Sequence, residues 1–153
     1  MTVPAEQIAA DLGALLLRGN RAHLYDRLTE GVVGVDSTTY PVLSGLARAG
    51  PATASRLADL IGLDRTVATR YATRLEQAGL VTRAADADDA RATRLSLTPE
   101  GRQAVQTMRT ALESILAEAL STSEPEEIET FARVLQRLLD ALVPAPPGAP
   151  LRR

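Results

Sequence analysis

Apolar residues near the start of the chain recur every three or four positions, the spacing of one helix face. This pattern covers residues 4–28 and predicts a helix that ends before Gly31 and Gly34. Its apolar positions are Ile8, Leu12, Leu15, Leu16, Gly19 and Ala22. A similar stripe lies near the other end, at Ile128, Phe131, Leu135, Leu138 and Leu142. Ser123 with Glu126 three residues later predicts a capping box at the start of this last helix.

Three shorter helices are predicted between these two, over residues 38–48, 53–60 and 64–78. Pro41 stands in the first turn of the first of them, where a missing N–H is tolerated. Thr53 and Asp64 can cap the other two by accepting a backbone hydrogen bond. A glycine follows each helix, at Gly50, Gly62 and Gly79, as is typical of helix ends.

The pattern then changes to alternation. Residues 81–83 and 94–97 predict two strands of a hairpin, with Leu95 and Leu97 on one face. Thr98-Pro99-Glu100 has the features of a helix start, with Thr98 as the cap and proline at the first helical position. The helix that follows has its apolar stripe at Ala104, Met108, Leu112, Ile115 and Ala119.

Residues 52–81 have the features of a helix-turn-helix. Ala58 provides the small residue where the two helices cross, and Gly62 tolerates a positive φ in the turn. The inner face is apolar, with Leu57, Ile61, Leu63, Ala68, Tyr71, Ala72 and Leu75. Because a hairpin follows, the order of elements predicts a mainly α fold with a small β-hairpin wing, the winged helix-turn-helix.

The second helix of this motif has an outer face of arginine, threonine and one valine, namely Arg65, Thr66, Val67, Thr69, Arg70, Thr73 and Arg74. Such a face enters the major groove of DNA in helix-turn-helix proteins. Arg65 and Arg70 can bind guanine edges or phosphates, and Val67 can contact a thymine methyl group. Arg74 is expected nearer the phosphates. A solvated helix face is the alternative, and the neighbouring wing favours DNA.

The loop between the predicted strands, "DADDARA" over residues 86–92, forms the tip of the wing. An arginine at a hairpin tip can enter the minor groove, where the potential is most negative. We expect Arg91 to make this contact and Asp89 to hold it through an ion pair. Arg83 and Arg94 can reach the DNA backbone. A plain charged loop is the alternative, and it explains Asp89 equally well.

Composition excludes several classes of function. The net charge of −2 does not itself indicate a nucleic-acid partner, but all 17 basic residues are arginine, and eight lie within residues 51–102. The absence of cysteine excludes thiolate metal sites and catalytic thiols, and the single histidine excludes a multi-histidine metal site. No apolar run approaches the roughly 20 residues that cross a bilayer, and no signal-like segment begins the chain. A cytoplasmic protein without metal or cofactor is expected.

Two segments, "GLDRTVATRYATRLEQAGLVTR" (62–83) and "DDARATRLSLTPEGR" (88–102), resemble a MarR-family transcriptional regulator. The second is similar to the wing signature of that family, Asp-x-Arg followed by Leu-Thr-x-x-Gly at a helix start. The order of helices follows the family over residues 5–143. One departure is Ala90, which stands where the family often has the first of two adjacent arginines.

The resemblance implies a homodimer that binds a pseudo-palindromic operator in double-stranded DNA, and we expect a repressor. It also implies release by a small effector, phenolic or anionic, bound between the dimer helices and the DNA lobe. Nothing in the spacing of residues identifies the effector site.

Four parts are predicted along the chain. They are an N-terminal dimerisation helix (1–35), a winged helix-turn-helix lobe (36–98), C-terminal dimerisation helices (99–143) and a disordered proline-rich tail (144–153). The two terminal apolar stripes are independent support for a dimer, since the central motif needs neither. Either stripe can also pack within a single subunit.

An enzyme is the first alternative class, and the sequence argues against it. It contains no G-x-G-x-x-G, P-loop or G-x-S-x-G motif. His23 has no cysteine to activate, and its nearest acid, Asp26, is one helical turn away. The second alternative is a winged-helix protein-interaction module without DNA binding. Salt dependence distinguishes the two, because phosphate contacts weaken steeply with salt.

Overall fold

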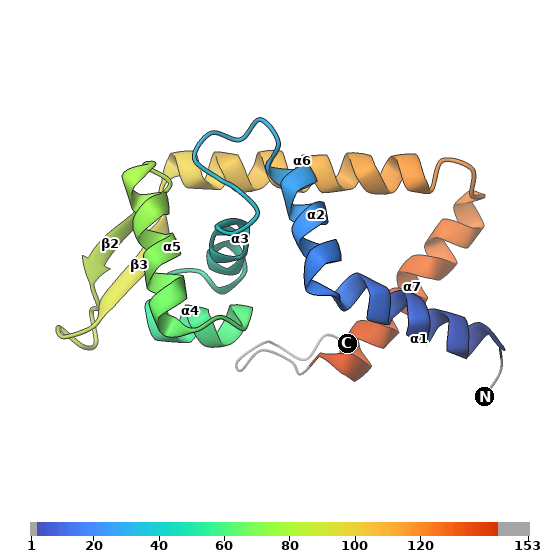
Figure 1. Ribbon diagram of the computed structural model, residues 1–153, viewed down its shortest axis with the longest axis horizontal. Coiled ribbons are helices and arrows are strands. Elements are labelled where there is room, and N and C mark those ends of the chain that lie inside the picture. Colours follow the sequence, from blue (N-terminus) through green and yellow to red (C-terminus); the bar gives the residue numbers. More distant parts are fainter. Residues whose placement is uncertain (1–2, 144–153) are drawn as a thin grey trace. The chain divides into compact units, whose positions relative to one another are not determined.

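The computed structural model describes residues 3–143, which form seven helices and three short strands (Figure 1). The helices are α1 (Val3–Leu16), α2 (Arg18–Thr29), α3 (Tyr40–Ala49), α4 (Ala54–Ile61), α5 (Arg65–Gln77), α6 (Pro99–Ala119) and α7 (Pro125–Leu142). The strands are β1 (Ala52–Thr53), β2 (Val81–Ala85) and β3 (Thr93–Leu97). The predicted tail, 144–153, lies outside the described residues. The chain divides into two compact units, one up to Glu113 and one from Ser114.

The prediction of one continuous N-terminal helix was wrong. The helix is interrupted at Leu17, whose φ of −59° and ψ of 134° are extended, and α1 and α2 are separate. The following residues include Gly19 and Asn20, which are weak helix formers. The side-chain amide of Asn20 donates a hydrogen bond to the carbonyl of Ala14 at 2.7 Å, which satisfies one of the acceptors that the end of α1 leaves open.

The central helices α3, α4 and α5 begin and end within two residues of their predicted limits. The side chain of Thr53 accepts a hydrogen bond from the Arg56 N–H at 3.3 Å, and that of Asp64 accepts one from the Thr66 N–H at 2.7 Å. Gly62 has the expected positive φ, +67°, and ends α4. The predicted helix-turn-helix is therefore confirmed in its caps and its turn.

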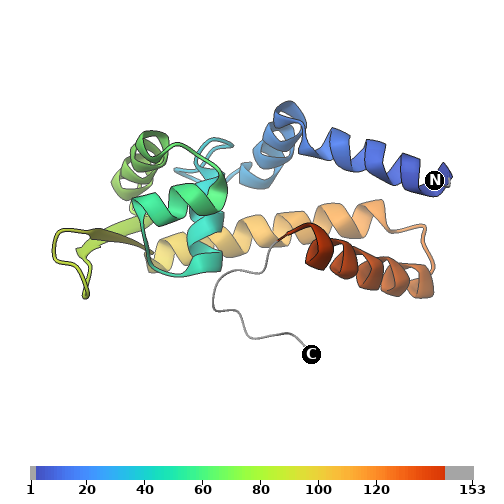
Figure 2. The same ribbon diagram turned by 90° about the horizontal axis from the view of Figure 1, so that it is seen from below.

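The three strands form one antiparallel sheet in the order β1-β3-β2. The hairpin pairs Val81 with Leu97 and Ala85 with Thr93, and it projects beside α5 (Figures 1 and 2). The two-residue strand β1, which pairs Ala52 with Leu95, was not predicted, because two residues are too short to show alternation. The sheet closes one side of the core, where Leu95 is buried.

The core of the first unit is built from aliphatic side chains of α3 to α6 and the strands. It consists of Val42, Leu43, Leu46, Ala52, Leu57, Ala72, Leu75, Leu80, Val81, Leu95, Ala104 and Met108. Small residues allow the two helices of the motif to approach, since Ala58, Ala68 and Ala72 are almost wholly buried. This packing fixes which face of α5 points away from the protein.

The start of α6 is joined to the turn that follows α5. Thr98 Oγ1 accepts a hydrogen bond from the Gly101 N–H at 3.0 Å and donates one to the Gly79 carbonyl at 2.7 Å, so its predicted capping role is confirmed. Gly101 lies against the backbone of Leu80, where an added Cβ would be only 2.0 Å from the carbonyl oxygen. Only glycine fits this crossing without movement of the backbone.

The second unit contains the end of α6 and all of α7. The capping box of α7 lies one residue later than predicted: the carboxylate of Glu127 accepts a hydrogen bond from the Glu124 N–H at 3.0 Å, and Pro125 takes the first helical position. No residue of α7 is buried. Of the apolar stripe of this helix, Phe131, Leu135 and Leu142 are 53%, 37% and 65% exposed, while Ile128 and Leu138 are half-buried.

Candidate nucleic-acid interface

The inward face of α5 is defined by Ala68, Ala72 and Leu75, which are buried. Of the predicted contact residues, the structure exposes Arg65, Thr66, Arg70, Arg74, Asp89 and Arg91, and half-buries Val67, Thr69, Thr73 and Arg94. The side chains at positions 65, 66 and 70 therefore project from the outward face of the helix. The guanidinium of Arg70 lies 5.4 Å from the ring centroid of Tyr71, within the range of a cation–π contact.

Thr73 and Arg83 contact each other within the protein. The hydroxyl of Thr73 donates to the Thr69 carbonyl at 3.0 Å and accepts from Nη2 of Arg83 at 2.7 Å. Nε of Arg83 lies 3.0 Å from the Glu76 carboxylate. This Nε is buried and its N–H is not aligned for a hydrogen bond, so the contact with Glu76 is ionic. Arg83 therefore ties β2 to α5.

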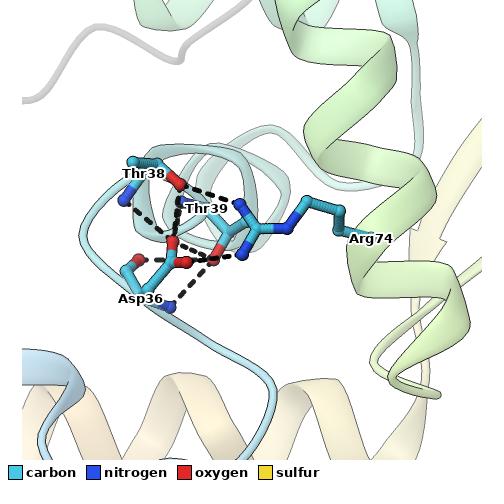
Figure 3. Close-up of polar contacts among 4 residues, drawn as sticks. All are labelled: Asp36, Thr38, Thr39 and Arg74. Carbon is cyan, nitrogen blue, oxygen red and sulfur yellow. Dashed lines mark hydrogen bonds and ion pairs between the residues drawn. The ribbon is translucent and has the colours of Figure 1, made fainter.

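Arg74 also has an internal partner, which was not predicted. Its Nη2 lies 2.5 Å from Oδ2 of Asp36, in the loop before α3, and its Nη1 donates to Thr38 Oγ1 at 3.1 Å (Figure 3). Asp36 and Arg74 are 38 positions apart in the sequence. The side chain of Arg74 is half exposed, so this ion pair lies at the surface of the protein.

Asp36 is held by several hydrogen bonds besides the ion pair. Its Oδ1 accepts from the backbone N–H groups of Thr38 and Thr39 at 3.0 Å each, and from the Thr38 hydroxyl at 2.6 Å. Partial burial alone would raise the pKa of Asp36, but these bonds and the guanidinium of Arg74 outweigh it. The pKa is held far below the usual range of a carboxyl.

In the wing, Asp86 binds both the backbone of the tip and Arg94. Its Oδ1 accepts from the Asp88 N–H at 2.8 Å, and its Oδ2 accepts from Nε of Arg94 at 2.9 Å. The backbone bond to Asp88 is the largest cause of a lowered pKa at Asp86, and the charge of Arg94 adds to it. Which aspartate would do this could not be predicted, because residues 86–89 contain three of them.

Asp89 lies at the tip, but it does not form the expected ion pair. Its Oδ1 accepts from the backbone N–H of Arg91 at 3.0 Å, so it stabilises the turn. Among residues 3–143, the ion pairs are those of Arg74, Arg83 and Arg94. Arg65, Arg70 and Arg91 take part in none of them. The arginines predicted near DNA therefore form two groups. The internally bound group is Arg74, Arg83 and Arg94, and the outward-facing group is Arg65, Arg70 and Arg91.

Two other features bear on function. In the part of the chain that the structure describes, His, Asp and Glu side chains form no cluster of three or more that could hold a metal ion. Among the same residues, no helix combines the length and apolar character needed to cross a membrane.

The tandem helices α4 and α5 with the β2–β3 hairpin beside them define a winged helix-turn-helix protein. Residues 33–92 match the MarR family. The chain is 30% identical over 129 residues to the HTH-type transcriptional regulator PrsX of Escherichia coli, covering 82% of this chain and 77% of that protein. It belongs to the MarR family of DNA-binding transcriptional regulators, whose members act as regulators and not as enzymes.

A second relative and a solved structure agree with this. The chain is 28% identical over 109 residues to the HTH-type regulator YdgJ of Bacillus subtilis, spanning 71% of this chain but 66% of YdgJ, just under two thirds. A crystal structure of a probable transcriptional regulator from Pseudomonas aeruginosa superimposes with a TM-score of 0.60 at 30% identity. That comparison covers 88% of this chain and 98% of the other.

Proposed function

We propose that this chain is a repressor that binds a pseudo-palindromic operator in double-stranded DNA as a homodimer. The observation that carries the proposal is the outward-facing arginine group, Arg65 and Arg70 on α5 and Arg91 on the wing, none of them in an internal ion pair within residues 3–143. Cations of this kind can neutralise phosphates or bind guanine edges. α5 takes the major groove and the wing takes the minor groove.

The proposed contacts are divided between the two elements. On α5 they are Arg65, Thr66, Val67, Thr69 and Arg70, and on the wing Arg91 enters the minor groove beside α5. Thr73, Asp89 and Arg94 have internal partners. In this proposal they hold the contact residues of α5 and the wing in place. This division follows from the contacts within the lobe.

The dimer is proposed from the terminal helices. Ile8 and Leu15 of α1 and Phe131 and Leu135 of α7 are exposed large apolar residues, and a second copy of the chain would remove such side chains from water. In this proposal residues 1–35 and 99–143 form the dimerisation segments around a DNA lobe at 36–98. A two-fold axis between the lobes presents two copies of α5 to an inverted repeat.

Selection of bound sequences from random duplex DNA tests the function directly. An inverted repeat with half-site centres about 10–10.5 bp apart is the expected result. Affinity for that sequence should then fall steeply as salt is raised, with a slope of about −0.9 per phosphate neutralised. Failure to enrich any sequence, with binding to a protein partner that salt hardly changes, would instead support the protein-interaction module.

We also propose that a small anionic effector releases the DNA. An open hollow of about 410 Å³ lies beside α3, β3 and α6, and its lining includes Arg102, Arg109 and Gln106 with apolar Leu46 and Val105; one nitrogen of Arg102 donates to the Leu97 carbonyl. No acidic residue is among its lining residues, which favours a carboxylate or phenolate. Titration of a bound operator complex with salicylate and with uncharged benzyl alcohol tests this, and release by both alike would contradict it.

A further inference from the structure

The two ion pairs that end on α5 lie on opposite flanks of the helix. Arg74 is held by Asp36 on one flank, and Glu76 is held by Arg83 on the other. Successive residues turn by about 100° around a helix, so side chains two positions apart project about 160° from each other. The arc between the two flanks contains Thr66 and Arg70, which belong to the face proposed to meet DNA.

The loop that carries Asp36 is itself rigidly attached. Asp36 receives backbone hydrogen bonds from Thr38 and Thr39 in the turn that starts α3. Close to the end of α5, Gly34 approaches Ala78 so closely that an added Cβ would lie 2.7 Å from the Cβ of Ala78. Arg74 is therefore bound to a fixed support, since both ends of this short loop are anchored.

We propose that Asp36 and Arg74 are positioning residues which, together with the Glu76–Arg83 pair, fix the rotation of α5 about its own axis and so select the bases that Arg70 and Thr66 reach. This inference rests on the proposed function and deepens it. Arg74 then acts through Asp36 and Thr38. In this proposal it does not neutralise a phosphate, although the sequence analysis expected Arg74 to lie near the phosphates.

The chemistry of Arg74 explains why an arginine serves this role. Its planar guanidinium reaches Asp36 with one nitrogen and Thr38 with the other (Figure 3). A lysine carries the same charge but is a single point donor on a flexible stem, and it cannot reproduce a two-acceptor contact in a fixed plane. A phosphate contact, by contrast, depends mainly on the charge.

Two conservative variants separate the two roles. Asp36→Asn removes the charge of the support and replaces Oδ2, the acceptor for Arg74, with an amide nitrogen that cannot accept, while Oδ1 still accepts from Thr38 and Thr39. Arg74→Lys keeps the charge and removes the planar guanidinium. If Arg74 positions α5, each variant lowers affinity for the selected operator by about tenfold, as expected for coupled neighbours. Neither lowers affinity for random duplex DNA, and the slope of affinity against salt is unchanged. The double variant loses little more than either single one.

A phosphate-binding Arg74 gives opposite results. Asp36→Asn would then strengthen binding to all DNA, because it frees Arg74 and removes a negative charge, and Arg74→Lys would have little effect. These outcomes overturn the proposal. Asp59→Asn and Arg48→Lys, at exposed positions of the same lobe, are the matched controls for a general effect of charge, and both should bind as the unaltered chain does.

A measurement without DNA keeps the failure of this inference distinct from failure of the proposed function. Amide hydrogen exchange of the unaltered chain and the two variants reports the order of α5 directly. Faster exchange in the last two turns of α5, with controls unchanged, supports the positioning role even if no DNA were bound. Unchanged exchange in both variants, or binding of the operator as tightly as by the unaltered chain, overturns it.

Discussion

The carboxylate of Asp86 accepts a hydrogen bond from Nε of Arg94 at 2.9 Å, across the two strands of the wing. The side chain of Asp86 is 8% exposed, while that of Arg94 is 41% exposed. The same carboxylate accepts backbone hydrogen bonds from Asp88 and Asp89. Asp86 thus connects the backbone of the loop that carries Arg91 to strand β3.

Asp86→Ala should therefore loosen the wing tip while the rest of the lobe stays folded. The variant loses the acceptor for two backbone N–H groups and for Arg94, so proteolysis and amide exchange within residues 86–92 should increase. Affinity for the operator should fall by roughly 1–2 kcal/mol if the ordered tip supports a minor-groove contact. Asp88→Ala at the same tip is the control, because its side chain is exposed, and equal effects of the two would contradict the assignment.

Arg91→Ala should weaken operator binding by about 1–3 kcal/mol. The reason is that Arg91 is the outward-facing cation at the wing tip, and it has no internal ion pair within the described residues. Preference for A·T pairs at the flank of each half-site should relax, because a narrow minor groove attracts arginine. Titration of operators with A·T and G·C flanks measures both effects, and unchanged affinity at moderate salt would remove Arg91 from the interface.

Stability should decrease in acid through Asp36. Its pKa in the folded chain is lower than the ordinary carboxyl value, so the folded state binds fewer protons there than the unfolded state. The contribution is fully present above the unfolded pKa, near 4, and is lost as the pH falls below that value toward the folded pKa. Unfolding free energies measured from pH 6 to pH 2 should show a smaller decrease in Asp36→Asn than in the unaltered chain. Parallel curves would contradict the assignment.

Local features were predictable from the sequence and distant pairings were not. Thr53, Asp64 and Thr98 were predicted as caps because a cap binds a backbone group only two or three residues away. The partner of Arg74 could not be predicted in this way, because Asp36 is remote in sequence and the sign of a charge does not specify which opposite charge it meets. Three of the arginines predicted near DNA therefore have internal ion pairs that local sequence patterns did not indicate.

The break at Leu17 and the late capping box have related explanations. Periodicity predicts that a segment is helical but gives its limits poorly, and the apolar stripe of residues 4–28 continues past the interruption. At α7, Ser123 and Glu124 both stand three residues before a glutamate. Proline at position 125 decides between them, because it is favoured at the first helical position, which makes Glu124 the cap.

Gly101→Ala should destabilise the fold. A Cβ at this position would lie 2.0 Å from the Leu80 carbonyl oxygen, and backbone cannot move aside as a flexible side chain can. A loss of about 1–3 kcal/mol in unfolding free energy is expected from such overpacking. Gly13→Ala in α1, where an added Cβ meets nothing within 4 Å, is the matched control and should stabilise the chain or leave it unchanged. Similar thermal unfolding of Gly101→Ala and the unaltered chain would contradict the close approach.

A charge placed in the apolar stripe of α7 should separate the proposed dimer. Leu135 is 37% exposed in the single chain, so glutamate at this position can stay solvated in a monomer. In a dimer sealed by α7, the same carboxylate would be buried without a partner, which costs several kcal/mol. Leu135→Glu should therefore reduce dimerisation and operator binding together while circular dichroism stays helical. Arg137→Glu on the same helix is the control for charge alone. Light scattering at micromolar concentration gives the decisive measurement, because a folded monomer of the unaltered chain would exclude the dimer, whatever the variants did.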